Sequence, residues 1–549
     1  MLSILGCRPM NQRVILSLAL VLVMPAGAVP VRAETPLRQA IDTEVKAVWQ
    51  REQITPAERA DDSTFLRRIY LDLVGTIPTY EATRQFLADT AADKRAKLID
   101  RLLEDPRYAT HMADIWKPIL ISRNPTHPDI QQQQPALYQW LTDKFAKNEP
   151  YDRWVRELLL AEGTSADNGS ILFYVQFTGR AEETAIAASR IFLGTQIQCA
   201  QCHDHPLDKW KQLDFYGLAG FFSRLAVTDG GSMNGKRRLM IAEKSTGEVR
   251  FVPAGEQRPG KQGTPVPPKF LNGAALEEPP VPKDFKEPML KAGQVPPKPL
   301  FSRKEKLAEW LTAGDNPFFA RAMANRLWGQ FMVRGLYHPV DDLRDNRPAS
   351  NPQLLQALQA QFVAHQFDLK WFIRELVNSE TYQLSMGTGA GTDSYAQRRP
   401  RPLSAEEMLA ALQQATGFDA AARASGKPGD ARPSGDLVRE VLRDFGEPVD
   451  GRGVFQGSLN ERLFMNNSNY LRQLIQRRKG NLMDALLSST APWEERVDQL
   501  YLSVLSRLPR EQERKRFVEY LTSDPQKPDP LVEEAIWVLL TCSEFRFNH

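Results

Sequence analysis

The chain has 549 residues, of which 42% are hydrophobic and 25% are charged, the composition of a globular protein long enough for two or more domains. Its formal net charge is only +3, so electrostatics give no reason to expect a nucleic acid or an anionic membrane as partner. Four cysteines are too few to staple a chain of this length, so its stability must come from ordinary hydrophobic cores.

Residues 1–33 have the pattern of a secretory signal peptide. An apolar run at residues 14–24 follows two arginines, and small residues lead to a cleavage site that ends at Ala33. The run is too short to span a bilayer, and we expect no transmembrane anchor elsewhere. The sequence therefore predicts an exported protein, periplasmic or extracellular, with cleavage near Ala33. Removal of the three arginines in this segment leaves a mature chain with as many basic residues as acidic ones, of which there are 67.

Helical patterns predominate from residue 34 to residue 229. Residues 94–103 place four aliphatic side chains on one face, and we expect Pro106 to stop that helix. Residues 182–193 predict another helix, with Gly194 as its C-terminal cap. We assign residues 34–229 to a first helical domain.

The pattern changes between residues 230 and 300, where prolines, lysines and glycines are frequent. Short β-like pieces at 237–241 and 248–252 alternate with turns, which predicts a small β-element followed by a Pro-rich connector. Helical patterns return over 301–549, including residues 352–364. The predicted fold class is mainly α: two helical domains joined by a Pro-rich connector with a small β-element.

The clearest chemical signal is the run Cys199-Ala200-Gln201-Cys202-His203. Cys-x-x-Cys-His is the attachment sequence for c-type haem, in which both thiols form thioethers and the histidine becomes an axial iron ligand. Export agrees with this interpretation, because covalent haem attachment in bacteria takes place outside the cytoplasm. We expect one haem c at Cys199, Cys202 and His203. The sequence leaves the sixth iron ligand open among several available side chains, including Met240, Met332 and His338.

Two other interpretations of the same run stay open. The site could bind zinc or another divalent metal directly, through His203 and His205 or through a set made of Cys199, Cys202, His205 and Asp208. In an oxidising compartment the two cysteines could instead close a disulfide loop with no ligand. Beside a haem, His205 and Asp208 could orient His203 or a propionate, or they could cap the next helix.

A second polar cluster follows in the C-terminal half. It contains His338, Asp341, Asp342 and Arg344. Paired carboxylates beside a histidine and an arginine could support acid–base chemistry or a cation site. We favour the alternative that these residues form a helix-capping loop in which the arginine forms an ion pair.

Several stretches of the chain resemble known domains. The motifs are Phe65 to Pro78, Phe192-Leu193-Gly194, Gln198 to Pro206, Asp214 to Phe222, Asn325 to Trp328, Gly335 to Arg344 and Ser543 to His549. The first four resemble a planctomycete-type cytochrome-like domain, the domain of unknown function 1549. The other three resemble the domain of unknown function 1553, which usually follows it. The resemblance covers nearly the whole mature chain and implies this two-domain architecture and a cytochrome character, but no reaction.

The sequence lacks a P-loop, a Rossmann fingerprint, a His-Glu-x-x-His run and a Gly-x-Ser-x-Gly elbow, so nucleotide-driven and common hydrolase chemistry have no support. We expect a cytochrome-like protein in periplasmic electron transfer or redox chemistry, with a redox partner protein. A metal-site enzyme and a binding or scaffold protein without haem are the alternatives. Whether the protein is an enzyme stays open.

Overall fold

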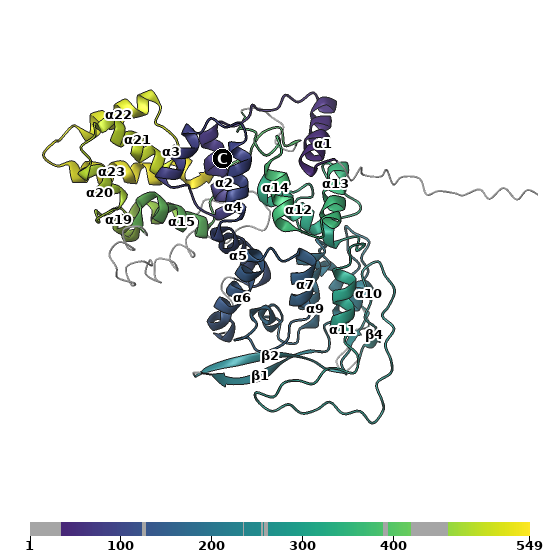
Figure 1. The fold of residues 1–549 in the computed structure, drawn as a ribbon. Helices are drawn as coiled ribbons and strands as arrows, with labels where there is room; N and C mark the ends of the chain where they lie inside the picture. Colours follow the sequence, from purple (N-terminus) through teal and green to yellow (C-terminus); the bar gives the residue numbers. More distant parts are fainter. Residues whose placement is uncertain are drawn as a thin grey trace, which may run out of the picture. The chain divides into compact units, whose positions relative to one another are not determined.

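The computed structural model describes residues 35–122, 128–233, 235–253, 256, 262–387, 394–418 and 459–549. The predicted signal peptide lies outside these residues. The described part is mainly α, as predicted, with three small two-stranded sheets (Figure 1). Among the described helices, none combines the length and the apolar character that a membrane crossing requires.

The helices before the connector are α1 (Leu37–Glu52), α2 (Asp62–Val74), α3 (Tyr80–Ala88), α4 (Lys94–Leu103), α5 (Pro106–Leu120), α6 (Pro128–Ala146), α7 (Tyr151–Leu159), the 3₁₀ turn η1 (Gly169–Ile171), α8 (Leu172–Val175), α9 (Ala181–Phe192), the 3₁₀ turn η2 (Gln198–Gln201) and α10 (Gln212–Gly220). Those after it are α11 (Arg303–Leu311), α12 (Phe319–Met332), α13 (Pro352–Ala364), α14 (Leu369–Val377), α15 (Ala405–Thr416), α18 (Leu459–Asn467), α19 (Asn469–Ile475), α20 (Leu482–Ser488), α21 (Trp493–Val504), α22 (Glu511–Leu521), α23 (Pro528–Thr541) and α24 (Ser543–Arg546).

The ends of three helices show how local sequence sets their bounds. Helix α4 ends at Leu103, before Pro106, as the sequence predicts. Pro106 also opens α5, at a position where a backbone N–H would have no intrahelical partner, and the Asp105 carboxylate accepts the N–H of Arg107. Gly194 follows α9 with a φ of +62°, the left-handed conformation expected of a C-terminal cap.

The β-element lies where the sequence predicts it. Strands β1 (Leu225–Met233) and β2 (Lys236–Glu243) form one antiparallel pair, and β3 (Val249–Phe251) and β4 (Thr264–Val266) form another. A third pair joins β5 (Arg401–Pro402) to β6 (Phe547–Asn548), which ties the end of the chain to the start of α15.

Two hydrophobic cores organise the described residues. The larger core extends from Leu37 to Ala396 and so includes side chains from both sides of the connector. One contact across it is the stacking of Tyr151 on Phe319, with ring centroids 4.7 Å apart. The second core comprises residues of the C-terminal helices from Leu403 onward, together with two side chains near the end of α2, Leu71 and Ile77.

The cores thus divide near residue 400, whereas the predicted domain borders lie at 229/230 and 300/301. Residues from Thr35 to His549 belong to one compact unit. The predicted borders therefore stay a prediction about the sequence. They do not separate the hydrophobic cores, because buried apolar contacts cross them.

Candidate functional site

The Cys-x-x-Cys-His run forms a tight turn between α9 and α10. The 3₁₀ turn η2 carries Cys199, and Cys202 follows directly after it. Both side chains are exposed and both thiols are free. The turn is anchored by Ala200, whose side chain is fully buried and whose N–H donates to the carbonyl of Ile197 at 2.9 Å. The sequence placed the motif at a helix end or in the loop beyond, and the turn agrees with that.

His203 is exposed and has a defined ring orientation. Its Nδ1 lies 2.8 Å from the carbonyl oxygen of Asp204. Since a carbonyl oxygen only accepts, Nδ1 must carry the proton in this contact, and the lone pair of the neutral ring is then at Nε2. A histidine that binds a metal through one nitrogen commonly donates its other N–H to a backbone carbonyl in this way.

His205 has the opposite arrangement. The residue is 91% buried, and its backbone N–H donates to the carbonyl of Trp210 at 2.8 Å. Its ring Nδ1 accepts the backbone N–H of Leu207 at 3.2 Å. The neutral ring therefore carries its proton at Nε2, and burial lowers the pKa of His205. A metal at His205 would require this ring to give up its hydrogen bond to Leu207 or its Nε2 proton.

The carboxylates near the motif are used in local turns. Asp204 accepts the N–H of Gln212 at 3.2 Å and pairs with Lys211 at 3.0 Å, so it fixes the start of α10. The hydrogen bond from Lys211 and that from Gln212 lower the pKa of Asp204. Asp208 accepts the N–H of Lys209 at 2.8 Å. In the described ranges, no three His, Cys, Asp or Glu side chains are grouped so that they could hold a metal ion.

The second polar cluster consists mainly of ion pairs. The buried Asp341 accepts from Arg190 at 3.2 Å and from Gln196 at 3.3 Å. Asp342, also buried, accepts from Arg344 at 2.8 Å and 2.7 Å through its two oxygens. These contacts favour the structural interpretation of the two carboxylates over acid–base chemistry.

The structure brings the two polar clusters together, which the sequence did not predict. The N–H of Leu343 donates to the carbonyl of Gly194 at 2.8 Å, and Lys209 pairs with Asp345 at 2.5 Å. A Cβ on Gly194 would lie 2.8 Å from Leu343 Cδ1, and the φ of +62° at this position favours glycine. The loop between α12 and α13 therefore packs directly on the segment that carries Cys199 and Cys202.

Two of the three side chains that the sequence offers as a sixth iron ligand are buried, and the third is half-buried. Met240 in β2 and Met332 at the end of α12 are 3% and 6% exposed and belong to the buried interior. His338 is half-buried and precedes a cis bond to Pro339.

A buried polar network escaped the sequence analysis, although it runs through the quoted motifs. Asp72 in α2 accepts from Tyr382 at 2.8 Å, Arg398 at 3.2 Å, Arg401 at 2.9 Å and Asn548 at 2.7 Å. Every residue of α2 from Phe65 to Val74 is buried, including the charged ones. Charged residues at the apolar positions of a helix were the available signal for such a network.

Two further arginines of α2 extend this network to the end of the chain. Arg67 donates to the carbonyls of Val504 and Phe545, and Arg68 donates to those of Tyr382 and His549. Figure 1 shows the C-terminus beside α2. The N-terminal motif at 65–78 and the C-terminal motif at 543–549 are thus the two sides of one hydrogen-bonded contact.

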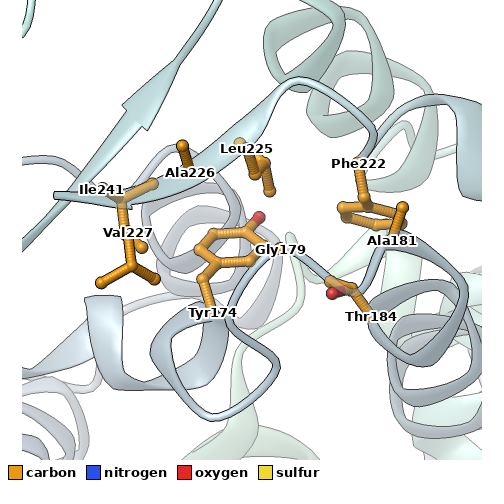
Figure 2. Close-up of a pocket in the computed structure, with 9 residues that line it drawn as sticks. All are labelled: Tyr174, Gly179, Ala181, Thr184, Phe222, Leu225, Ala226, Val227 and Ile241. Atoms are coloured by element: carbon orange, nitrogen blue, oxygen red, sulfur yellow. The ribbon is translucent and has the colours of Figure 1, made fainter. Parts of the chain in front are cut away.

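A pocket beside the first sheet is separate from the Cys-x-x-Cys-His turn (Figure 2). Its lining is formed by Tyr174, Gly179, Ala181, Thr184, Phe222, Leu225, Ala226, Val227 and Ile241. The Tyr174 hydroxyl donates to the carbonyl of Leu159 at 2.7 Å, and burial holds the pKa of this phenol well above its ordinary value. The lining offers no thiol, imidazole or carboxylate, so we assign it no chemistry.

Fold and site together define a mainly α protein that presents an exposed Cys-x-x-Cys-His turn against a polar loop from its other half. The family described as Protein of unknown function (DUF1549) matches residues 40–227, and the family described as Protein of unknown function (DUF1553) matches residues 303–434. The two families match the chain in the order that the resemblance predicts, and the motif at 543–549 lies outside the matched residues. No curated protein and no solved structure matches it.

Proposed function

We propose that this protein is an exported, c-type cytochrome-like protein that holds one covalent haem through Cys199, Cys202 and His203 and exchanges electrons with a partner protein. One observation carries the proposal. Two free, exposed thiols lie at the spacing of the haem attachment sequence, directly before an exposed imidazole whose Nδ1 is fixed by a backbone carbonyl.

The surroundings of the turn fit a surface-attached haem. Leu207 and Leu213 are large apolar side chains that are 56% and 53% exposed. Leu207 lies four residues after His203 in the sequence, and Leu213 lies on α10, which packs against η2. Exposed leucines next to the attachment cysteines can cover the apolar faces of a porphyrin.

Haem supplies one-electron redox chemistry when it is bound. The chain would contribute two thioether anchors at Cys199 and Cys202 and an iron ligand at His203 Nε2. The exposure of all three side chains would leave the group accessible to a partner protein. A single haem needs only one small domain around it, so a chain of this size has room for docking surfaces as well.

The test is haem attachment in cells that export the protein and express the cytochrome c maturation machinery. We expect haem to survive denaturing electrophoresis and to give a pyridine haemochrome spectrum with one haem per chain. The Cys199→Ser/Cys202→Ser variant should lose it. The matched control is Cys542→Ser, which removes the third described thiol, a half-buried one after α23, and should keep the haem.

Absence of haem from the wild-type protein under these conditions would overturn the proposal. Metal analysis of the same sample would then separate the two alternatives. Zinc that is lost in the double variant indicates a direct metal site, and a sample without haem and without metal indicates a binding or scaffold protein.

A further inference from the structure

Arg344 is a charged residue that the C-terminal half of the chain places at the cysteine turn. Its guanidinium is held by the buried Asp342, with Nε 2.8 Å from one carboxylate oxygen and Nη2 2.7 Å from the other. The Arg344 side chain is 22% exposed and that of Asp342 is 8% exposed. A two-point contact of this kind fixes the orientation of the planar guanidinium.

The cysteine turn lies within electrostatic range of this guanidinium. The hydrogen bond to Asp342 is the main reason that the pKa of Arg344 is raised, and the nearby charge of Asp208 adds to it. Arg344 therefore lies near Asp208, which follows the cysteine turn in the sequence.

Hydrogen bonds on both sides of Arg344 hold it in this place. The preceding residue, Leu343, donates its N–H to Gly194 at 2.8 Å, and the Asn346 side-chain amide donates to the carbonyl of Leu207 at 2.5 Å. Gly194 and Leu207 flank the motif in the sequence, so the loop is bound on both sides of the cysteine turn. Its position relative to Cys199 is built into the fold.

We propose that Arg344 forms a carboxylate-binding subsite that receives a propionate of the haem attached at Cys199 and Cys202, so that the second half of the chain completes the site of the first. Asp342 occupies the Nε–Nη2 edge of the guanidinium, and the edge that Nη1 and Nη2 share can bind a second carboxylate. This inference rests on the proposed function.

The test is the midpoint potential of the purified haem protein. Replacement of Arg344 by glutamine removes a positive charge beside the haem and leaves the propionate uncompensated. Both effects stabilise the ferric state, so we expect the potential of Arg344→Gln to fall below that of the wild type. Arg344→Lys keeps the charge and should restore most of the difference.

Arg347→Gln is the matched control. The Arg347 guanidinium also donates to Asp342, at the backbone carbonyl oxygen 3.1 Å away, but the Arg347 side chain is 45% exposed. We expect this variant to keep the wild-type potential. A potential of Arg344→Gln equal to that of Arg347→Gln would overturn the inference, provided that both proteins carry one haem.

Haem content, read first from the haemochrome spectrum, separates the two claims. If the wild type carries no haem, the proposed function fails and the subsite fails with it.

If Arg344→Gln does not fold, Asp342→Asn provides the opposite change, because it keeps Arg344 and removes a negative charge beside it. That variant should raise the potential, and an unchanged or lowered potential would contradict the subsite.

Discussion

At the scale of single residues, Asp72 is the most consequential buried charge. Its carboxylate is 2% exposed and receives hydrogen bonds from Arg398, Arg401, Tyr382 and Asn548. Burial alone would raise the pKa of Asp72, but the two arginines outweigh burial and hold it below its ordinary value. The carboxylate is ionised in the folded protein and balances the arginines around it.

Asp72→Ala should strongly destabilise the protein, since it leaves Arg398 buried without its carboxylate. Loss of one partner of a buried ion pair costs about 3–5 kcal/mol, and we expect a loss in that range in the free energy of unfolding measured with urea. Glu380→Ala is the control, because Glu380 is 71% exposed and its pair with Lys46 should contribute less than about 1 kcal/mol. Equal losses in the two variants would refute the role given to Asp72.

The network also predicts loss of stability in acid. Burial opposes the ionised form of Glu407, but Arg401 outweighs it, so the pKa of Glu407 is lowered from 4.5, as that of Asp72 is from 3.8. A carboxylate with a lowered pKa in the folded state stabilises it above the unfolded pKa and loses this contribution as the pH falls. Unfolding free energies measured between pH 7 and pH 3 should decline below about pH 4.5. The decline should be smaller in Asp72→Asn, and an unchanged decline would argue against the network as its source.

Gly75 should tolerate no side chain. It has a φ of +68°, and a Cβ there would lie 2.5 Å from Nδ1 of the buried His111. Gly163 has a similar conformation, with a φ of +89°, but a Cβ there meets nothing within 4 Å. Gly163→Ala should therefore cost only the backbone strain of about 1 kcal/mol, and Gly75→Ala should cost clearly more. Thermal unfolding of the two variants measures the difference, and equal shifts would show that the contact with His111 relaxes freely.

At the scale of elements, local patterns predicted helices well and contacts between them poorly. Residues 94–103 and 352–364 form α4 and α13 with the predicted bounds. The two short strand pieces were also found, because alternation and turn residues act over a few positions. Helix α4 ends before Pro106 as predicted, but the start of α5 at the same proline was not predicted.

The candidate site was predictable only in part. The cysteine motif was visible because its three residues are adjacent in sequence. The docking of Leu343 on Gly194 joins residues about 150 positions apart, and such a contact leaves no periodic signal. The opposite tautomers of His203 and His205 were equally hidden, since they depend on which backbone groups the fold brings to each ring.

The connector is fastened to the fold at Glu278. Its carboxylate accepts from the buried Arg224 at 2.8 Å and from the buried Arg303 at 2.9 Å. Beyond it the connector is open to solvent, with Met289 and Val295 96% and 78% exposed.

Glu278→Ala should therefore loosen the connector and make trypsin cleave it faster at its exposed lysines. The comparison variant is Glu309→Ala, which removes an exposed partner of Lys306 within α11 and should leave the cleavage rate unchanged. Equal cleavage rates in the wild type and Glu278→Ala would show that this ion-pair cluster does not hold the connector.

At the scale of the whole molecule, the two matched families do not correspond to two separate cores. The larger core combines side chains from both matches, and the hydrogen bonds of Arg67 and Arg68 tie α2 to the end of the chain. The cysteine turn and the loop that carries Arg344 also come from different matches. The pairing of the two families in one chain has a physical reason, because each half completes the other's interior.

A fragment of residues 35–300 should therefore not fold on its own. It would expose apolar side chains that pack on the C-terminal half, such as Tyr151 against Phe319. We expect this fragment to aggregate or to lack a cooperative unfolding transition by circular dichroism, in contrast to the mature chain. A soluble fragment with a sharp transition would show that the first match is an independent domain.

The most direct test of the central claim is mass spectrometry of the exported protein made in cells with the cytochrome c maturation machinery. Trypsin releases residues 191–209 as one peptide that contains Cys199, Cys202 and His203. We expect this peptide to carry the mass of one haem and its absorbance, with both thiols consumed. A peptide of unmodified mass, or one lighter by the two hydrogens of a disulfide, would contradict the account.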